Sequence, residues 1–251
     1  MTKETKIYVV GQDIISKDLT YKLQKQGYKN ILTTDYNPYD KQKLKEFFIK
    51  NKPEIVVLDP SKDVDGYLQN RYIFSGHLNQ VKRIIKFNNF MHQKEYSKLI
   101  TNIHYDVFYT DSYLEENPIS EIVRTMHEAK IYGDMYVGVE SGLQPLNILF
   151  LDDLTDAIVH IMKLENKGRT INVDNCCEMN LRNVAYILKD IIKYEGDLRY
   201  EDVDEEEKKP MISINDLGWK ARYNFETTIR KIYNRLIDKH KYFMVSNIIV
   251  N

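Results

Sequence analysis

The residues whose type and spacing could do chemistry begin with Gly11, which directly follows a short strand predicted at residues 6–10. A glycine between a first strand and a first helix lets the backbone approach a dinucleotide pyrophosphate at the helix N-terminus. Asp35, at the end of a second predicted strand, can accept a hydrogen bond from a ribose 2′-hydroxyl, although turns also favour Asp at such positions. The two residues are therefore candidates for binding a dinucleotide cofactor.

The elements that must position these residues alternate between short apolar runs and longer amphipathic ones. This alternation is typical of βαβ units and a parallel sheet. The first half of the chain predicts strands at residues 6–10, 31–35, 55–58 and 99–103, and helices at residues 14–26, 41–50 (with Asp40 as N-cap) and 72–91. The long helix from Tyr72 to Met91 is expected to bury Leu78, Val81, Ile84, Ile85 and Phe87.

A different pattern follows Asn117. It predicts helices at residues 119–130, 154–163, 180–193 and 226–237, with Asn180 as the N-cap of the third, and strands at residues 135–139, 147–151 and 169–173. The acidic run at residues 201–207 has no His or Cys beside it, so we expect a solvated loop and no metal site.

Composition limits the classes of protein that the chain can belong to. Its 251 residues are 43% hydrophobic and 29% charged, so they can form a buried core. The formal charge is −1, which argues against a nucleic-acid partner. The only cysteines, Cys176 and Cys177, are adjacent and predict neither a disulfide nor a zinc site. With no signal-peptide pattern and no membrane-spanning apolar run, we expect a cytoplasmic protein.

Five ordered segments carry a resemblance to a known family. They are Lys-Ile-Tyr-Val-Val-Gly at residues 6–11, Asn-Pro-Ile-Ser-Glu-Ile-Val-Arg at 117–124, Ile-Leu-Phe-Leu-Asp-Asp at 148–153, Thr-Ile-Asn-Val at 170–173 and Asp-Leu-Gly-Trp at 216–219. In this order and spacing the chain resembles the GDP-L-fucose synthases, which are NAD-dependent epimerase/dehydratases of the extended short-chain dehydrogenase/reductase class.

The resemblance implies an α/β fold, with a Rossmann-like parallel sheet and a small C-terminal sugar-nucleotide lobe. On this basis we predict a degenerate Rossmann-type domain at residues 1–116, a substrate-lobe-like region at 117–238 and a C-terminal tail at 239–251. NADP or NAD would be the cofactor if the family's function persists.

The family's phosphate loop has the pattern G-x-x-G-x-x-G, of which only Gly11 remains. Ile14 and Lys17 replace the other two glycines, and Ile14 would place a β-branched side chain where backbone must approach phosphate. Asp59 and Pro60 replace the small residues after the third strand. These changes predict that no cofactor is bound.

Reduction in this family uses a Ser, a Tyr and a Lys four residues after the Tyr, placed after the fourth strand and on the helix that follows. With the fourth strand at residues 99–103, the serine pair falls at His104 and Tyr105, and the epimerisation cysteine at Asp106. Only 13 positions separate His104 from Asn117, too few for the catalytic helix and a further strand.

Two Tyr-x-x-x-Lys matches occur elsewhere, at Tyr21/Lys25 and at Tyr39/Lys43. Both lie before the third predicted strand, on elements that carry no catalytic group in the family. We therefore predict no catalytic residues and expect that the catalytic helix has been lost from this chain.

The family's substrate-binding positions are partly kept. The epimerisation histidine aligns with Asn117, and an arginine of the family becomes Leu146. Arg124 persists from an arginine pair, and Lys208 or Lys209 matches a lysine near the diphosphate. Arg124 and Lys208 are candidate diphosphate ligands, since guanidinium and ammonium groups suit phosphate oxygens. The alternative is that both are ordinary surface charges.

Four other polar residues fit structural roles better than catalytic ones. Asp152 and Asp153 open a predicted helix, where carboxylates satisfy unpaired amides. His127 and His160 lie on predicted helices and are interpreted as structural.

The leading hypothesis is a catalytically impaired relative, or pseudoenzyme, that binds a GDP-linked nucleotide sugar or a protein partner. One alternative is an active NADP-dependent GDP-4-keto-6-deoxy-mannose epimerase/reductase, and another is a purely structural or interaction domain. The helix from Tyr72 to Met91 corresponds to one that pairs subunits in the family, so a homo- or hetero-oligomer through it is also predicted.

Overall fold

The computed structural model describes residues 1–11, 13–34, 40–58, 81–88, 100–104, 107–109, 118–141, 146–165, 169–173, 178–202, 211–227, 229–230 and 233–234. The chain forms two compact units. Unit 1 consists of Met1–Tyr105, Asp152–Val173 and Pro210–Trp219, and unit 2 consists of Asp106–Leu151, Asp174–Lys209 and Lys220–Asn251. The units are interleaved along the chain, whereas the lobes predicted at residues 1–116 and 117–238 are contiguous.

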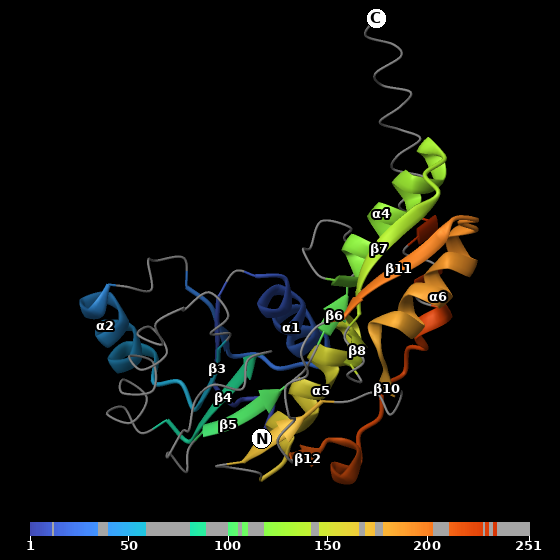
Figure 1. Ribbon diagram of the computed structural model, residues 1–251. Coiled ribbons are helices and arrows are strands. Elements are labelled where there is room, and N and C mark those ends of the chain that lie inside the picture. Colours follow the sequence, from blue (N-terminus) through green and yellow to red (C-terminus); the bar gives the residue numbers. More distant parts are fainter. Residues whose placement is uncertain are drawn as a thin grey trace, which may run out of the picture. The chain divides into compact units, whose positions relative to one another are not determined.

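Unit 1 is built around a parallel sheet, which has seven strands in the described part of the chain, in the order β12-β9-β5-β4-β3-β1-β2 (Figure 1). The strands are β1 (Ile7–Val10), β2 (Ile31–Leu32), β3 (Ile55–Leu58), β4 (Arg83–Asn88), β5 (Ile100–His104), β9 (Thr170–Asn172) and β12 (Ile212–Ser213). The predicted Rossmann-like parallel sheet is confirmed.

Helices on both faces explain why the central strands are almost entirely apolar. On one face, α2 (Lys41–Asn51) packs Leu44 and Phe48 against Tyr8 and Val56 of the sheet. On the other face lie α1 (Ile14–Lys25) and α5 (Leu151–Lys163). A short 3-10 helix, η1 (Asn215–Leu217), follows β12. The core of unit 1 thus lies between these two helical layers and the sheet.

Two predicted helix N-caps are confirmed by their hydrogen bonds. The Asp40 carboxylate accepts from the amides of Gln42 at 3.1 Å and Lys43 at 3.0 Å, at the start of α2. Asn180 accepts from the Asn183 amide at 2.8 Å, at the start of α6 (Leu181–Ile192). Each side chain satisfies amides that have no partner within the helix. The local sequence therefore predicted the start of both helices correctly.

The helix predicted from Tyr72 to Met91 is wrong at residues 83–88, which form β4 between β3 and β5. Ile84, Ile85 and Phe87 are fully buried, as expected for a strand covered on both faces. A short continuous apolar run fits both a helix and a strand, and here pairing with β3 and β5 makes it a strand. The rest of that predicted helix lies outside the described residues, except Val81 and Lys82, which are not helical. The subunit contact proposed through it loses its basis.

Unit 2 combines helices with two small sheets. In one sheet, β7 (Tyr136–Ser141) and β11 (Asp197–Asp202) are parallel and lie side by side (Figure 1). The other has the order β10-β8-β6, formed by Glu178–Met179, Leu146–Phe150 and Val107–Tyr109. The helix α4 (Pro118–Tyr132) packs with α6 and β7 around a core that includes Met126, Leu188 and Val139. The predicted terminal helix is present as helical turns at residues 225–227, 229–230 and 233–234.

Candidate functional site

The loop between β1 and α1 keeps the glycine that a dinucleotide site would use. Gly11 has φ of +112°, a conformation that glycine alone adopts readily. A Cβ added there would lie 2.5 Å from Asp13 Oδ2 and 3.0 Å from Ser16 Oγ. Asp13 is the N-cap of α1, and its carboxylate accepts from both the amide and the hydroxyl of Ser16 at 2.8 Å. The turn therefore needs Gly11 for the chain's own packing.

Ile14 occupies the second glycine position of the family's phosphate loop. Ile14 is the first residue of α1 and is half-buried, so a β-branched side chain stands where phosphate requires bare backbone. Lys17, at the third glycine position, is exposed on the helix surface. Asp35, the candidate ribose ligand, lies outside the described residues, as do Asp59 and Pro60.

Of the predicted diphosphate ligands, the structure describes only Arg124. Arg124 is exposed on α4 and forms no ion pair with another described residue. Lys208, Lys209 and Asn117 lie outside the described residues. Arg124 and Lys208 therefore stay predictions.

The fourth strand of the sheet is β4, so the position assigned to the family's serine pair at His104 and Tyr105 is wrong. Ile100–His104 is β5, which pairs with β4 on one side and with β9 on the other. The fourth strand ends at Asn88, and the segment that follows it is therefore residues 89–99. The prediction failed because β4 was predicted as part of a helix. The strand at residues 100–104 was therefore counted as the fourth, although it is the fifth.

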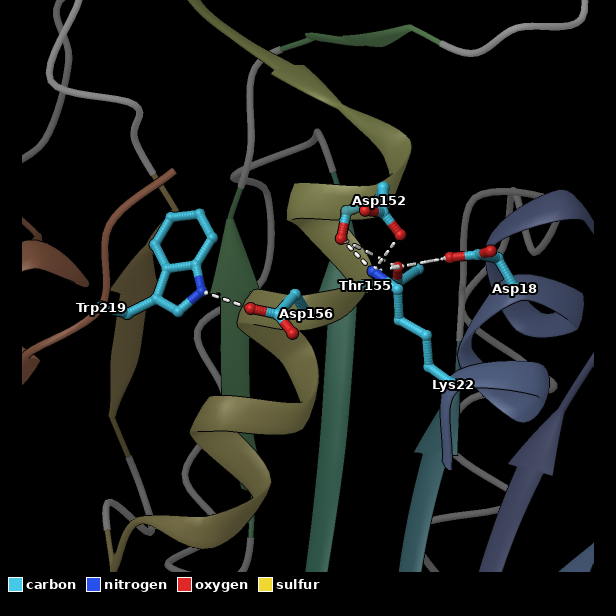
Figure 2. A network of polar contacts seen from close by, with 6 residues as sticks. All are labelled: Asp18, Lys22, Asp152, Thr155, Asp156 and Trp219. Carbon is cyan, nitrogen blue, oxygen red and sulfur yellow. Dashed lines mark hydrogen bonds and ion pairs between the residues drawn. The ribbon is translucent and has the colours of Figure 1, made fainter. Parts of the chain in front are cut away.

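The paired aspartates at the start of α5 take part in a polar network with α1 (Figure 2). Lys22 of α1 forms an ion pair with Asp152 at 2.7 Å and also donates to the Asp152 carbonyl. Thr155 donates to Asp18 at 2.5 Å. Asp153 is fully buried beside this network. These contacts give Asp152 a role in joining α5 to α1. In the sequence, the only signal of this network was the i,i+4 spacing of Asp18 and Lys22 on one helix.

A second set of contacts joins α5 to the segment after β12. Trp219 donates its indole N–H to Asp156 at 3.2 Å (Figure 2), and a ring nitrogen of His160 lies 3.0 Å from the Leu217 carbonyl oxygen. His127 contacts the Tyr233 hydroxyl at 3.1 Å within unit 2. The geometry of both histidines is that of packed, hydrogen-bonded residues.

Arg83 is a buried cation that the sequence did not single out. Its guanidinium donates to Thr101 Oγ1 at 3.1 and 3.2 Å and to the Met162 and Leu164 carbonyls at the end of α5. Burial lowers the pKa of Arg83 to about 10, so it remains charged at neutral pH. It fixes the C-terminus of α5 on the sheet, where a cation also meets the negative end of the helix dipole.

Polar residues occupy paired positions at the carboxyl ends of four neighbouring strands. In register, Asn88 pairs with His104, His104 with Asn172, and Asn172 with Ser213. Lys86 lies one pair earlier on the same face and is only 2% exposed. Ligands in open α/β sheets bind at the carboxyl ends of strands, so this row belongs to the candidate site. The sequence missed it because it depends on strand register.

The described residues contain no group of three or more His, Cys, Asp or Glu side chains that could share a metal ion. Across the same residues, no helix is both long enough and apolar enough to cross a membrane.

The fold is Rossmann-like, and solved nucleotide-sugar reductases share it. The GDP-mannoheptose C4 reductase of Campylobacter jejuni, solved with NADP bound, superimposes with a TM-score of 0.69 over 94% of this chain and 99% of that one, at 18% identity. The GDP-L-fucose synthetase of Naegleria fowleri bound to NADP has a TM-score of 0.68 over 96% of this chain and 95% of that one, at 15% identity.

Sequence comparison confirms the narrower resemblance, to the GDP-L-fucose synthases. The chain is 27% identical over 135 residues to the Oryza sativa protein named "Probable GDP-L-fucose synthase 1", a match covering 51% of this chain and 41% of that protein. It is 23% identical over 124 residues to the GDP-L-fucose synthase of Sinorhizobium fredii, covering 47% and 40%. The match thus spans about two fifths of the length of these curated relatives. No family model matches the chain.

Proposed function

We propose that this protein is a catalytically impaired relative of the GDP-L-fucose synthases that binds a nucleotide sugar without reducing it. The observation that carries the proposal is the length of chain between β4 and β5. Only residues 89–99 connect them, and a crossover between parallel strands usually needs about a dozen residues or more. A connection of this length is close to the minimum for such a crossover, so we infer that it cannot also supply a catalytic loop followed by a catalytic helix.

The residue types in this segment support the same proposal. Between residues 89 and 99 the sequence has one tyrosine, Tyr96, and position 100, four residues later, is Ile100 instead of lysine. A phenol needs a neighbouring ammonium to lower its pKa before it can protonate a ketone near neutral pH. Neither this segment nor the matches at Tyr21 and Tyr39 supplies that pair at the family's position.

The cofactor loop also supports a loss of reduction. Only Gly11 remains of the three phosphate-loop glycines, and its conformation serves the contact with Asp13 and Ser16. Hydride transfer requires a bound nicotinamide, which supplies the electrons, so a loop with Ile14 at the phosphate argues against a reductase.

The rival function is an active NADP-dependent nucleotide-sugar epimerase/reductase. The observation in its favour is that solved proteins of the same fold include reductases with NADP bound. A third possibility, a purely structural or interaction domain, gains support from the internal pairing of Lys22, Asp152 and Arg83.

Calorimetric titration of the full chain with NADPH, NADH, GDP and a GDP-sugar distinguishes these functions. The proposal expects binding of GDP and the GDP-sugar, no binding of either dinucleotide, and no turnover of a GDP-4-keto-6-deoxy sugar. NADPH binding with turnover would establish the rival function. The absence of binding by all four compounds would favour the structural domain.

A further inference from the structure

The turn that joins α4 to β7 in unit 2 exposes four large apolar side chains within six residues. They are Ile131, Tyr132, Met135 and Tyr136, which are 47%, 78%, 82% and 53% exposed, and we call them the 131–136 patch. Gly133 ends α4 with φ of +76°, and the Asp134 amide donates to the Ala129 carbonyl at 2.9 Å, which closes the helix end. Single exposed apolar residues are normal on a protein surface, whereas a cluster marks a contact site.

The neighbouring turn, between α6 and β11, brings acidic side chains to the same end of the unit. The strands β7 and β11 lie side by side, with Asp197 opposite Tyr136 in register (Figure 1). The Asp197 amide also donates to the Met135 carbonyl at 2.8 Å. The exposed carboxylates of the two turns are those of Asp134, Glu195 and Asp197. None of them forms an ion pair with another described residue.

The described cations near these carboxylates make other contacts or lie at a helix end. Lys130 donates to the Ile192 carbonyl at 2.6 Å, and the Arg199 guanidinium lies 3.8 Å from the centroid of the Tyr136 ring. Lys193 is exposed at the C-cap of α6. Among the described residues, the rim of the patch therefore has carboxylates that no cation pairs with.

The chain leaves the described part of unit 2 close to this patch. The Tyr233 hydroxyl lies 3.1 Å from a ring nitrogen of His127, five residues before the end of α4. Arg230 forms an ion pair with Asp190, two residues before the end of α6. Five residues of helix span about 8 Å, and five extended residues span about 17 Å. The C-terminal tail, which begins five residues after the last described residue, is therefore within reach of the patch.

The composition of the C-terminal tail complements this surface. Residues 239–251 include no Asp or Glu, and Lys239 and Lys241 precede two apolar runs at residues 242–245 and 248–250. Burial of apolar side chains against an apolar patch is favourable, and ammonium groups are attracted to unpaired carboxylates. The tail therefore carries the two kinds of side chain that the patch and its rim accept.

We propose that the C-terminal tail docks on the 131–136 patch of its own unit. Its apolar runs cover the patch, and its two lysines lie against the carboxylates of Asp134, Glu195 and Asp197. The docked tail withdraws the patch from solvent and from contact with other copies of the chain. This interaction is separate from the proposed binding of a nucleotide sugar, because it uses none of the residues of the candidate site.

The first test measures hydrogen exchange of the amides at residues 242–250 in the full chain, by mass spectrometry. Tyr132→Ser removes the ring of an exposed patch residue, and we expect the tail amides to exchange about tenfold faster than in wild type. Tyr21→Ser is the matched control, because Tyr21 is a 59% exposed tyrosine on α1 in unit 1. It should change the rate less than about twofold.

The second test changes the tail and observes the patch. Phe243→Ser should leave Met135 accessible, so we expect hydrogen peroxide to oxidise Met135 about fivefold faster than in wild type. Ser246→Ala is the control, since it removes no apolar side chain from the tail, and it should leave the rate unchanged. This test does not depend on the folding of Tyr132→Ser.

A double variant tests the charged contact. Lys239→Glu with Lys241→Glu places like charges against the acidic rim, and the tail amides should exchange several-fold faster at low salt. The difference from wild type should shrink at 1 M salt, where the charges are screened. An unchanged rate at low salt overturns the placement of the lysines.

Sedimentation velocity of the same proteins distinguishes the other occupants of the patch. Tail amides that exchange in wild type at the rate of an unfolded peptide overturn the proposal. Protection that persists in Tyr132→Ser also overturns it, because the tail then packs elsewhere. A dimer that dissociates in Tyr132→Ser assigns the patch to a second copy and overturns it too. Protection that is lost in Tyr132→Ser and kept in Tyr21→Ser, in a protein that stays monomeric, supports it.

Discussion

Arg83 in unit 1 is buried and Arg182 in unit 2 is half-buried, and the two guanidinium groups have different surroundings. Arg83 is 4% exposed and donates to a threonine and to two helix-terminal carbonyls. Arg182 stacks on a ring, and its Nε has no acceptor. A buried donor without an acceptor costs stability, so a fold keeps one only where something offsets the cost. Arg83 therefore contributes to folding through its hydrogen bonds, whereas the Nε of Arg182 contributes none.

The largest expected effect comes from removing the satisfied arginine. Arg83→Met leaves Thr101 and the carbonyls at the end of α5 without their donor, and we expect a loss of about 3 kcal/mol in the free energy of unfolding. Urea denaturation measures it, with Arg182→Met alongside. The second variant should change stability by less than about 1 kcal/mol, because its Nε gives up no hydrogen bond. Equal losses in the two variants would remove the distinction between the units.

The next effect concerns Gly11 in unit 1, whose conformation fits the turn that leads into α1. Gly11→Ala places a Cβ against Asp13 at a φ that favours glycine, and we expect a loss of about 2 kcal/mol. Gly138→Ala is the control, since a Cβ there meets nothing within 4 Å. Thermal and urea unfolding of both variants measure the difference, and a neutral Gly11→Ala would contradict a structural role.

A smaller effect is expected from the pair that joins α1 to α5. A double-mutant cycle with Lys22→Met and Asp152→Asn should give a coupling of about 1 kcal/mol, because the Lys22 side chain is only 11% exposed. The control cycle uses Lys29 and Glu4, which pair at the same 2.7 Å but are more than half exposed. Its coupling should be below about 0.5 kcal/mol. Similar couplings in the two cycles would show that burial of the pair adds nothing.

The smallest effect is the pH dependence contributed by Tyr200. Burial, followed by the neighbouring Tyr186 hydroxyl, raises its pKa from an ordinary 10 to about 12 in the folded state, so between these values the unfolded chain releases a proton that the folded chain retains. Stability from this group is therefore complete below about pH 10 and is lost as the pH rises towards about 12. Urea unfolding over this range should show a shallower decline for Tyr200→Phe than for wild type. An identical decline would mean that the phenol is not perturbed.

Local signals in the sequence predicted much of the fold. Asp40 and Asn180 are good N-caps directly before amphipathic runs, so α2 and α6 could be placed closely. The strand β4 could not be placed, because its apolar residues Ile84, Ile85 and Phe87 also satisfy a helical pattern. Only pairing with β3 and β5 distinguishes the two, and pairing is a long-range property.

The candidate site was less predictable for the same reason. Gly11 could be recognised because a turn after a first strand has a strong local requirement. The row from Asn88 to Ser213 depends on the register of four strands, which one sequence does not reveal.

The interleaving of the two units has a consequence for how the chain is made. Domains generally fold as units during synthesis, from the N-terminus onwards. Here the sheet that begins with β1 lacks β9 and β12 until Thr170–Asn172 and Ile212–Ser213 have left the ribosome. Arg83 likewise waits for Met162 and Leu164 before its guanidinium is satisfied. The nascent first unit therefore exposes an incomplete sheet edge until these segments have been made.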